Sequence, residues 1–308
     1  MKNWISGIPY EIAFWESVYS NKKSIKKLFR WSKYNKEIEL TDFNVKQFLS
    51  QKENQIIVDA GCGMSYCNGD KLDGKQLNIC YIDPLAPFYN RIIEKKKLDL
   101  PKITFGFIEY LSAFIPQKVS LIIIQNALDH SENPIKGILE CIESLEIGGV
   151  LYLRHHKNEA EIENYRGFHQ YNISLDNDEL IIWDKEAKIN INTFIKDFAD
   201  TETSTCENEI IAVITKKQEV TNVLVNYKKD IADLSNQYIE VIQNLNKASY
   251  VFLYHWNFFK FRVIQRFVHI FNWKTRQKIK KAIKKLTFTK AVGNDKLKMP
   301  NVSNNKNE

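Results

Sequence analysis

The chain has 308 residues, of which 44% are hydrophobic and 26% are charged. This composition excludes an intrinsically disordered protein, and the length accommodates one sizeable α/β domain with an appendage. The residues from Met1 to Pro9 contain no apolar run as long as that of a secretory signal, which favours a cytoplasmic protein. The cysteines form no paired C-x-x-C motifs, so we expect reduced thiols at Cys62, Cys67, Cys80, Cys141 and Cys206.

The net charge of +7 is concentrated in one segment. Residues 250–294 contain eleven Lys and Arg and no Asp or Glu, which leaves 33 basic against 37 acidic residues elsewhere. Most of the chain is therefore mildly acidic, and the overall basic charge does not by itself indicate a protein that binds nucleic acid.

The first elements in the chain read as helical. Ile8, Ile12, Trp15 and Tyr19 recur at spacings of four, three and four, which places them on one helical face. The basic stretch from Lys22 to Lys36 is typical of a solvated helix that packs on the domain behind it. We expect residues 1–50 to form a helical cap.

From residue 51 to residue 217, short apolar runs alternate with helical spacings. The runs predict strands at 55–59, 78–83, 102–107, 119–125, 150–154, 179–183 and 209–215. A helix is expected over 135–145, ending at Gly148-Gly149, and another near 192–198, with a polar loop from 155 to 177. Strands that alternate with helices predict an α/β fold with a doubly wound, mostly parallel sheet of seven strands.

Beyond residue 217 the pattern predicts a helical extension over 218–292 and a disordered tail over 293–308. One helical face collects apolar side chains, whereas basic side chains take the other: the apolar residues are Phe252, Trp256, Phe259, Val263, Phe267 and Ile270. Such an amphipathic helix suits an anionic membrane surface, contacted through residues 250–286 at the inner face of the membrane. Packing on the domain or on a second subunit in a homodimer is the alternative, and nucleic acid is the least favoured partner.

The loop Asp59-Ala60-Gly61-Cys62-Gly63 follows the first strand and predicts a ligand site. Glycines let a ligand approach the backbone, and Asp83 at the end of the second strand can accept hydrogen bonds from a ribose. A dinucleotide fingerprint would need a third glycine where the chain has Tyr66, so the loop favours a cofactor without pyrophosphate.

The successive motifs Val58–Gly63, Tyr81–Pro84, Asn126–His130 and Leu145–Gly149 resemble those of class I S-adenosylmethionine-dependent methyltransferases, in particular bacterial members of types 11 and 12. The resemblance covers about Gln55 to Thr215. It implies a sheet whose last strand is antiparallel to the others, and S-adenosyl-L-methionine as cofactor. It also implies the cofactor-binding residues, which are Asp59, Gly61, Gly63, Asp83, Pro84, Phe107, Ile108 and Asn126.

One departure from the family concerns the adenine site. Many members carry Gly-Asp-Ala-Glu after strand three, whereas this chain has Gly106-Phe107-Ile108-Glu109. Phe107 replaces the aspartate that reaches the adenine amino group, so apolar contact and backbone would hold the base.

On the acceptor side, histidines and a glutamate follow strands four and five. A hydroxyl acceptor needs a general base, and imidazole suits that role near neutral pH. The candidate catalytic residues are His130, His155, Glu159 and His169. Each of them can alternatively serve only to hydrogen-bond the loop in place. We expect no metal site, because these residues lack a tight H-x-x-x-H spacing.

The sequence thus predicts methyl transfer to an oxygen or nitrogen of a small-molecule or glycan-type acceptor, since some of the similar bacterial members are tied to surface polysaccharide synthesis. Two alternatives stay open. One is an RNA methyltransferase that uses the basic extension to hold phosphates, and the other is a non-catalytic protein that uses the fold for tethering.

Overall fold

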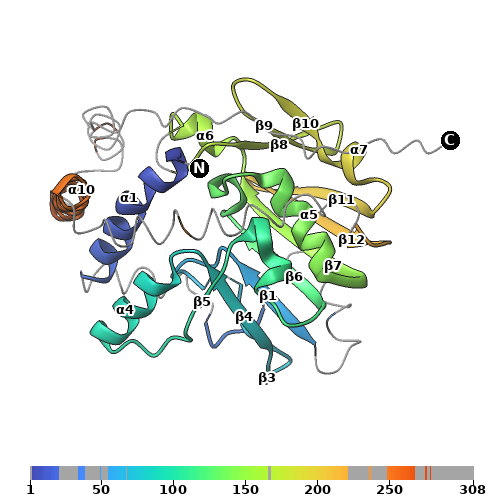
Figure 1. Cartoon of the computed structure of the whole chain (residues 1–308), viewed down its shortest axis with the longest axis horizontal. Coiled ribbons are helices and arrows are strands. Elements are labelled where there is room, and N and C mark those ends of the chain that lie inside the picture. The colour runs from blue at the N-terminus through green and yellow to red at the C-terminus, as the bar shows by residue number, and fades with distance from the viewer. Residues whose placement is uncertain are drawn as a thin grey trace.

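The computed structural model describes residues 2–20, 34–38, 49, 55–66, 68–165, 168–220, 236, 248–267, 275 and 278. A seven-stranded sheet in the order β11-β12-β7-β6-β1-β4-β5 forms its centre (Figure 1). These strands are β1 (Ile56–Ala60), β4 (Asn78–Asp83), β5 (Thr104–Phe105), β6 (Val119–Gln125), β7 (Leu145–His156), β11 (Ala199–Cys206) and β12 (Glu209–Lys216).

Only one strand of this sheet runs against the others. β12 pairs antiparallel with both β7 and β11, and the remaining neighbours pair in parallel. This order, with a single reversed strand next to the edge, is the class I methyltransferase fold. The predicted seven-stranded, doubly wound sheet is therefore confirmed.

The central strands are buried on both faces, as their continuous apolar runs predicted. Val58 and Ile122 face one layer, which contains α5 (Pro134–Ser144), whereas Ile57 and Leu121 face the layer that contains Ile38. The side chain of Asn133 starts α5 by accepting the Lys136 N–H at 3.0 Å. Three further short helices are α4 (Ala86–Lys96), η1 (Ile108–Ala113) and η2 (Leu128–His130).

One predicted strand belongs to a different sheet, and one strand of the main sheet was not predicted. Glu179–Trp183 is β9, which pairs with β8 (Asn172–Asp176) and β10 (Lys188–Asn190) in a separate three-stranded sheet. The seventh strand of the main sheet is instead β11, a largely exposed edge strand whose polar sequence carries no apolar run. A small hairpin of β2 (Lys71–Leu72) and β3 (Lys75–Gln76) was not predicted, and the third strand is shorter than expected.

Other boundaries also differ. The helix α5 ends at Ser144, and Gly148-Gly149 lies within β7 as an irregularity rather than at a helix stop. The predicted loop over 155–177 contains the end of β7, the short helix α6 (Glu159–Ile162) and β8. The helix expected near 192–198 is α7 (Ile191–Ile195). Val220 is still buried in the core, three residues past the predicted end of the domain.

The two ends of the described chain meet beside the sheet. Helix α1 (Lys2–Tyr19) and helix α10 (Ala248–Phe267) lie side by side (Figure 1). Ile8, Ile12 and Tyr19 are buried, as the predicted helical face required. No helix within the described ranges is long and apolar enough to span a membrane. Most of the predicted basic stretch over 22–36, along with residues 221–235 and 279–308, lies outside the described residues.

Candidate functional site

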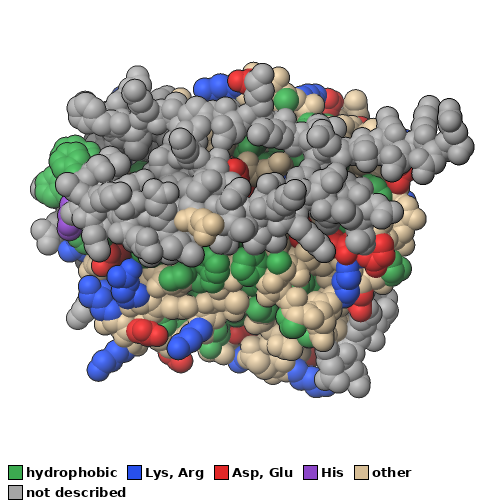
Figure 2. Space-filling view, viewed as in Figure 1, with side chains coloured by type: hydrophobic (Ala, Val, Ile, Leu, Met, Phe, Trp, Pro, Cys, Tyr) green, Lys and Arg blue, Asp and Glu red, His purple; other side chains and the backbone are tan. Residues whose placement is uncertain are grey.

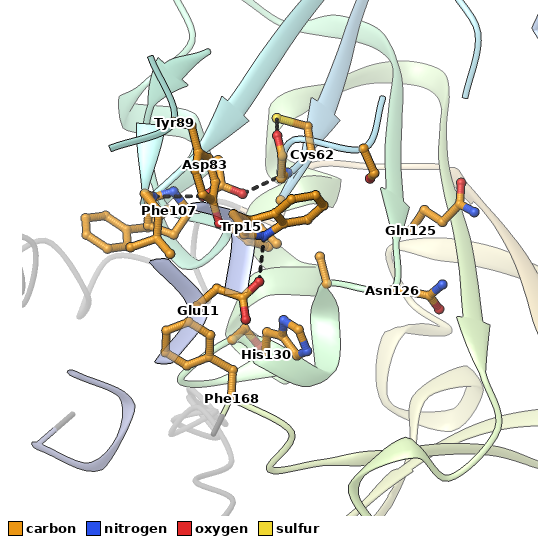
Figure 3. Close-up of a pocket in the computed structure, with 18 of the residues that line it drawn as sticks. Glu11, Trp15, Cys62, Asp83, Tyr89, Phe107, Gln125, Asn126, His130 and Phe168 are labelled. Carbon is orange, nitrogen blue, oxygen red and sulfur yellow. Dashed lines mark hydrogen bonds between the residues drawn. The ribbon is translucent and has the colours of Figure 1, made fainter. Parts of the chain in front are cut away.

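A pocket opens at the carboxyl ends of β1, β4 and β6, where the strand order reverses direction. Parallel α/β sheets bind their ligands at this place. Loops after these strands supply most of its lining, and α1 and Phe168 close one side (Figure 3). The lining residues are Glu11, Trp15, Gly61, Cys62, Gly63, Ser65, Asp83, Pro84, Leu85, Tyr89, Phe107, Ile108, Glu109, Gln125, Asn126, Ala127, His130, Ser131 and Phe168.

The glycine loop has a backbone conformation that favours glycine at two positions. Gly61 and Gly63 have φ values of 71° and 54°, a region that side-chain-bearing residues rarely adopt. A Cβ on Gly61 would lie 2.5 Å from the Cβ of Ala127, so a larger residue has no room there. The loop thereby presents bare backbone to the pocket.

Asp83 connects the glycine loop to the end of β4. Its Oδ2 accepts the Gly63 N–H at 3.0 Å, and its Oδ1 accepts the Leu85 N–H at 2.8 Å. Burial raises the pKa of Asp83 to about 6, although these two hydrogen bonds favour the charged carboxylate. The predicted neighbour Pro84 also lines the pocket.

Asp59 is the one predicted cofactor residue that does not line the pocket. Its side chain is buried, and its Oδ2 accepts a hydrogen bond from the amide of Asn68 at 3.2 Å. Burial raises the pKa of Asp59 to about 7. The structure therefore places this carboxyl outside the pocket lining, next to Asn68.

The segment after β5 forms an apolar wall. Phe107 and Ile108 line the pocket as predicted, and Phe107 packs edge-on against Phe105 with ring centroids 5.2 Å apart. Glu109 follows them, and its Oε1 accepts the backbone N–H groups of Glu132 and Asn133. Burial raises the pKa of Glu109.

Asn126 lies at the far side of the pocket, away from the glycine loop (Figure 3). Its φ of 49° is left-handed, and its side-chain Oδ1 accepts the His156 N–H at 2.9 Å. The side chain therefore ties β6 to β7, and it contributes to the pocket wall at the same time.

The lining residues that the sequence did not predict include Glu11, Trp15 and Phe168, which lie outside the loops at the strand ends. The indole N–H of Trp15 donates to Glu11 Oε1 at 2.7 Å, and its ring is 3.3 Å from a Cβ position on Gly63. Figure 3 shows Trp15 between Asp83 and His130. The sequence indicates Trp15 only as part of an apolar helical face, and no motif shows that this face borders the glycine loop.

The predicted catalytic residues are only partly brought together. His130 lines the pocket, and its Nε2 lies 3.0 Å from the Nδ1 of His169, which also bonds Asp129 Oδ2 at 2.8 Å. His155 is buried behind Asp129, with its Nδ1 3.9 Å from Asp129 Oδ1. Glu159 begins α6 and does not line the pocket.

These groups have shifted proton affinities. Burial lowers the pKa of His130, and it lowers that of His155 to about 4. Burial also acts to lower the pKa of His169, but the hydrogen bond and charge of Asp129 outweigh it and raise the value to about 9. Near neutral pH, His130 is therefore a neutral imidazole able to accept a proton, whereas His169 is an imidazolium beside a carboxylate.

No family model and no curated protein matches this chain. Among solved structures, it is similar to an S-adenosylmethionine-dependent methyltransferase from Clostridium acetobutylicum ATCC 824. The identity is 13%, the TM-score is 0.37, and the match covers 57% of this chain and 93% of that one. It is also similar to the N-methyltransferase NodS from Bradyrhizobium japonicum WM9 in complex with S-adenosyl-L-homocysteine, with 14% identity, a TM-score of 0.37, and 56% and 84% of the two chains covered.

A third similar structure is an rRNA methylase from Streptococcus thermophilus, with 15% identity, a TM-score of 0.32, and coverage of 57% of this chain and 95% of that one. The fold assignment rests on the strand order and strand directions of this chain's own sheet.

Proposed function

We propose that this protein is a methyltransferase that uses S-adenosyl-L-methionine. The observation that carries this proposal is the joint geometry of Gly61, Gly63 and Asp83 at the reversal point of the sheet. In this proposal the bare glycine backbone leaves space for the methionine part of the cofactor, and the pocket-lining carboxylate of Asp83 accepts hydrogen bonds from the ribose hydroxyls. Phe107 and Ile108 offer an apolar surface for the adenine.

Binding of S-adenosylhomocysteine, measured by calorimetry, tests this proposal. The wild type should bind, and Gly61→Ala should lose at least about 30-fold in affinity, because its Cβ would collide with Ala127 and strain the loop. Gly74→Ala is the matched control, since Gly74 also has a positive φ of 76° but a Cβ there meets nothing within 4 Å. An absence of binding by the wild type at millimolar ligand would refute the proposal.

We further propose an oxygen or nitrogen of a small-molecule or glycan-type acceptor, such as a sugar of a surface polysaccharide precursor. Trp15 and Phe168 offer aromatic faces of the kind on which sugar rings pack, and His130 can take the acceptor proton. In-line displacement from a sulfonium mainly requires that the acceptor atom is aligned with the methyl group and that water is excluded. A pocket that α1 and Phe168 close on one side favours both.

The charge of the pocket argues against a phosphate-bearing acceptor group inside it. Glu11, Asp83 and Glu109 contribute three carboxyls, and the described lining residues include no Lys or Arg. A phosphate in the pocket would meet like charge, so RNA is a poorer acceptor than a neutral or cationic molecule. Transfer of a radioactive methyl group to RNA, but not to hydroxylated or amine-bearing small molecules, would overturn this preference.

We also propose that the protein binds an anionic membrane surface through α10. Phe252, Trp256 and Phe259 are 67%, 41% and 60% exposed, and their spacing puts them on one helical face. Figure 2 shows hydrophobic side chains gathered at the position of α10. The basic segment that follows in the sequence supports attraction to anionic lipid.

A further inference from the structure

Three polar side chains converge where the pocket meets the ends of β6 and α6. Asp129 and His130 come from η2, and His169 comes from the segment before β8. The His169 Nδ1 is 2.8 Å from Asp129 Oδ2 and 3.0 Å from His130 Nε2, and the third side of the triangle, from His130 Nε2 to Asp129 Oδ2, is 3.6 Å. One oxygen and two nitrogens thus surround a common point.

One hydrogen on His169 Nδ1 can be shared between Asp129 Oδ2 and His130 Nε2, but it cannot lie in line with both acceptors. If both histidines were protonated at these atoms, two N–H groups would face each other across 3.0 Å. The second carboxylate oxygen, Asp129 Oδ1, is buried and has no hydrogen-bond partner among the described residues. A cation at the common point would instead be attracted to all three atoms.

The spacing of the three atoms fits such a cation. Zinc binds imidazole nitrogen and carboxylate oxygen at about 2.0–2.2 Å, so two ligands of a tetrahedral site lie roughly 3.3 Å apart. The observed separations of 2.8, 3.0 and 3.6 Å bracket this value, and shifts of a few tenths of an ångström would equalise them. Two imidazoles and one carboxylate leave a fourth tetrahedral position, for which the described residues offer no further ligand in this cluster.

We propose that Asp129, His130 and His169 bind a zinc-type divalent metal ion whose fourth position faces the pocket. The side chains of His130 and His169 are 25% and 22% exposed, so an ion can reach them, whereas that of Asp129 is 3% exposed and is fixed by its surroundings. The sequence does not show that these three residues are close together, because His169 is 40 residues from Asp129. They meet because the segment before β8 packs beside η2.

The role of the ion rests on the proposed methyl transfer. An acceptor hydroxyl at the fourth position would release its proton to solvent more readily, because the cation stabilises the alkoxide. A lone pair of that oxygen would then form the bond to the methyl carbon. The electron pair of the broken carbon–sulfur bond would stay on sulfur and leave a neutral thioether. In this arrangement His130 serves as a ligand rather than as the proton acceptor.

Metal titration of the full chain tests the inference. After treatment with a chelator, the wild type should bind one equivalent of Zn²⁺ by calorimetry, and the Co²⁺ form should show the visible absorption of tetrahedral cobalt. His169→Ala and His130→Ala should each weaken Zn²⁺ binding by at least about 30-fold and abolish the cobalt spectrum. His156→Ala is the matched control, because this exposed histidine lies at the end of β7 and bonds Glu209 instead.

Circular dichroism on the same preparations shows whether a variant is folded. S-adenosylhomocysteine binding shows whether the cofactor site is intact. If His169→Ala is misfolded, the conservative variant Asp129→Asn replaces it and should show the same loss. Cofactor binding without metal binding, or metal binding that all three variants retain, would overturn the metal site alone. Metal binding without cofactor binding would support the metal site and overturn the methyltransferase proposal.

Discussion

At the scale of single residues, the two buried aspartates of the first two strands have different tasks. Asp83 lines the pocket and accepts hydrogen bonds from the backbone N–H groups of Gly63 and Leu85. Its carboxylate therefore helps to hold the glycine loop in place. Asp59 does not line the pocket, and its Oδ2 accepts a hydrogen bond from the Asn68 amide. The two carboxyls lie on neighbouring strands, and the charge of Asp59 adds to the burial that raises the pKa of Asp83.

The stability of the fold should depend on pH through Asp59. Its pKa in the folded protein, about 7, lies above the ordinary value of 3.8, so the folded form retains a proton that the unfolded chain loses. The stabilisation is therefore fully present below about pH 4 and is lost as the pH rises through about 7. Asp59→Asn keeps an uncharged acceptor for Asn68 and should raise the free energy of unfolding at pH 8 by about 2–4 kcal/mol.

Urea unfolding at pH 8 and at pH 4 measures this difference, which should almost vanish at the lower pH. Asp178→Asn makes the same chemical change at an exposed turn and should have little effect at either pH. An Asp59→Asn variant that is no more stable than the wild type at pH 8 would show that folding does not raise the pKa of Asp59.

The sequence was sufficient to predict pocket residues whose position depends only on their neighbours along the chain. Gly61, Gly63 and Asp83 stand at strand ends, where backbone conformation and neighbouring chain decide their geometry, so a short motif was enough to place them. Glu11 and Phe168 line the same pocket but come from distant segments. Their position depends on how α1 and the segment before β8 pack against the domain. A short sequence motif does not predict this packing.

At the scale of elements, α1 is a wall of the pocket that α10 supports from outside. Glu11 and Trp15 face the pocket, whereas Tyr10 and Phe14 make edge-on contacts with Phe261 of α10, with centroids 5.1 and 5.6 Å apart. The contact is extended by a hydrogen bond from Arg262 Nη1 to the Ser20 carbonyl at 3.1 Å and by one from the Tyr254 hydroxyl to Glu16. Loosening α10 should therefore loosen the pocket.

Phe261→Ala tests this coupling. The variant should bind S-adenosylhomocysteine about 3- to 10-fold more weakly, because part of the binding energy is spent on ordering α1. Amide hydrogen exchange should rise in α1 and stay unchanged in β1 and β6. Phe259→Ala removes the same side chain from the same helix at a position that is 60% exposed, and its affinity should match the wild type. Equal affinities for both variants would mean that α10 does not support the site.

Strands were predicted correctly where burial on both faces gives the sequence a continuous apolar run. They were missed or misassigned where it does not. β1 and β6 are buried on both faces, so their apolar runs were unmistakable. β11 is an edge strand of Thr, Glu and Ser, which its pairing with β12 holds in place, and β9 has an apolar run that serves a different sheet. For α10, the predicted aromatic face is the exposed one, and a different face with Phe261 packs on α1.

At the scale of the whole molecule, the exposed aromatic side chains of α10 predict binding to lipid. The full chain should bind vesicles of equal parts phosphatidylcholine and phosphatidylglycerol, with an affinity that falls as salt rises, because screening acts over about 8 Å at physiological ionic strength. Replacing Phe252, Trp256 and Phe259 together by Ser should weaken binding by at least about tenfold. Vesicle sedimentation measures both effects.

The control for this prediction replaces Ile147 and Ile162 by Ser. These side chains are 56% and 58% exposed but lie outside α10, so vesicle binding should persist. A parallel titration with RNA, at the same charge concentration and the same salt, shows whether the chain prefers RNA or the anionic vesicles. If RNA binds more tightly than the vesicles, or if the triple variant associates with lipid like the wild type, the membrane proposal is wrong.

The contact between α1 and α10 also has a consequence for synthesis. A ribosome delivers α1 first, and more than two hundred residues of sheet and connections follow before α10 is made. Because domains fold as they emerge, the sheet can assemble on a nascent chain whose Tyr10 and Phe14 still face water. The glycine loop would then exist well before the outer support of its wall. Tight cofactor capture should be among the last properties that a newly made molecule acquires, after α10 has left the exit tunnel.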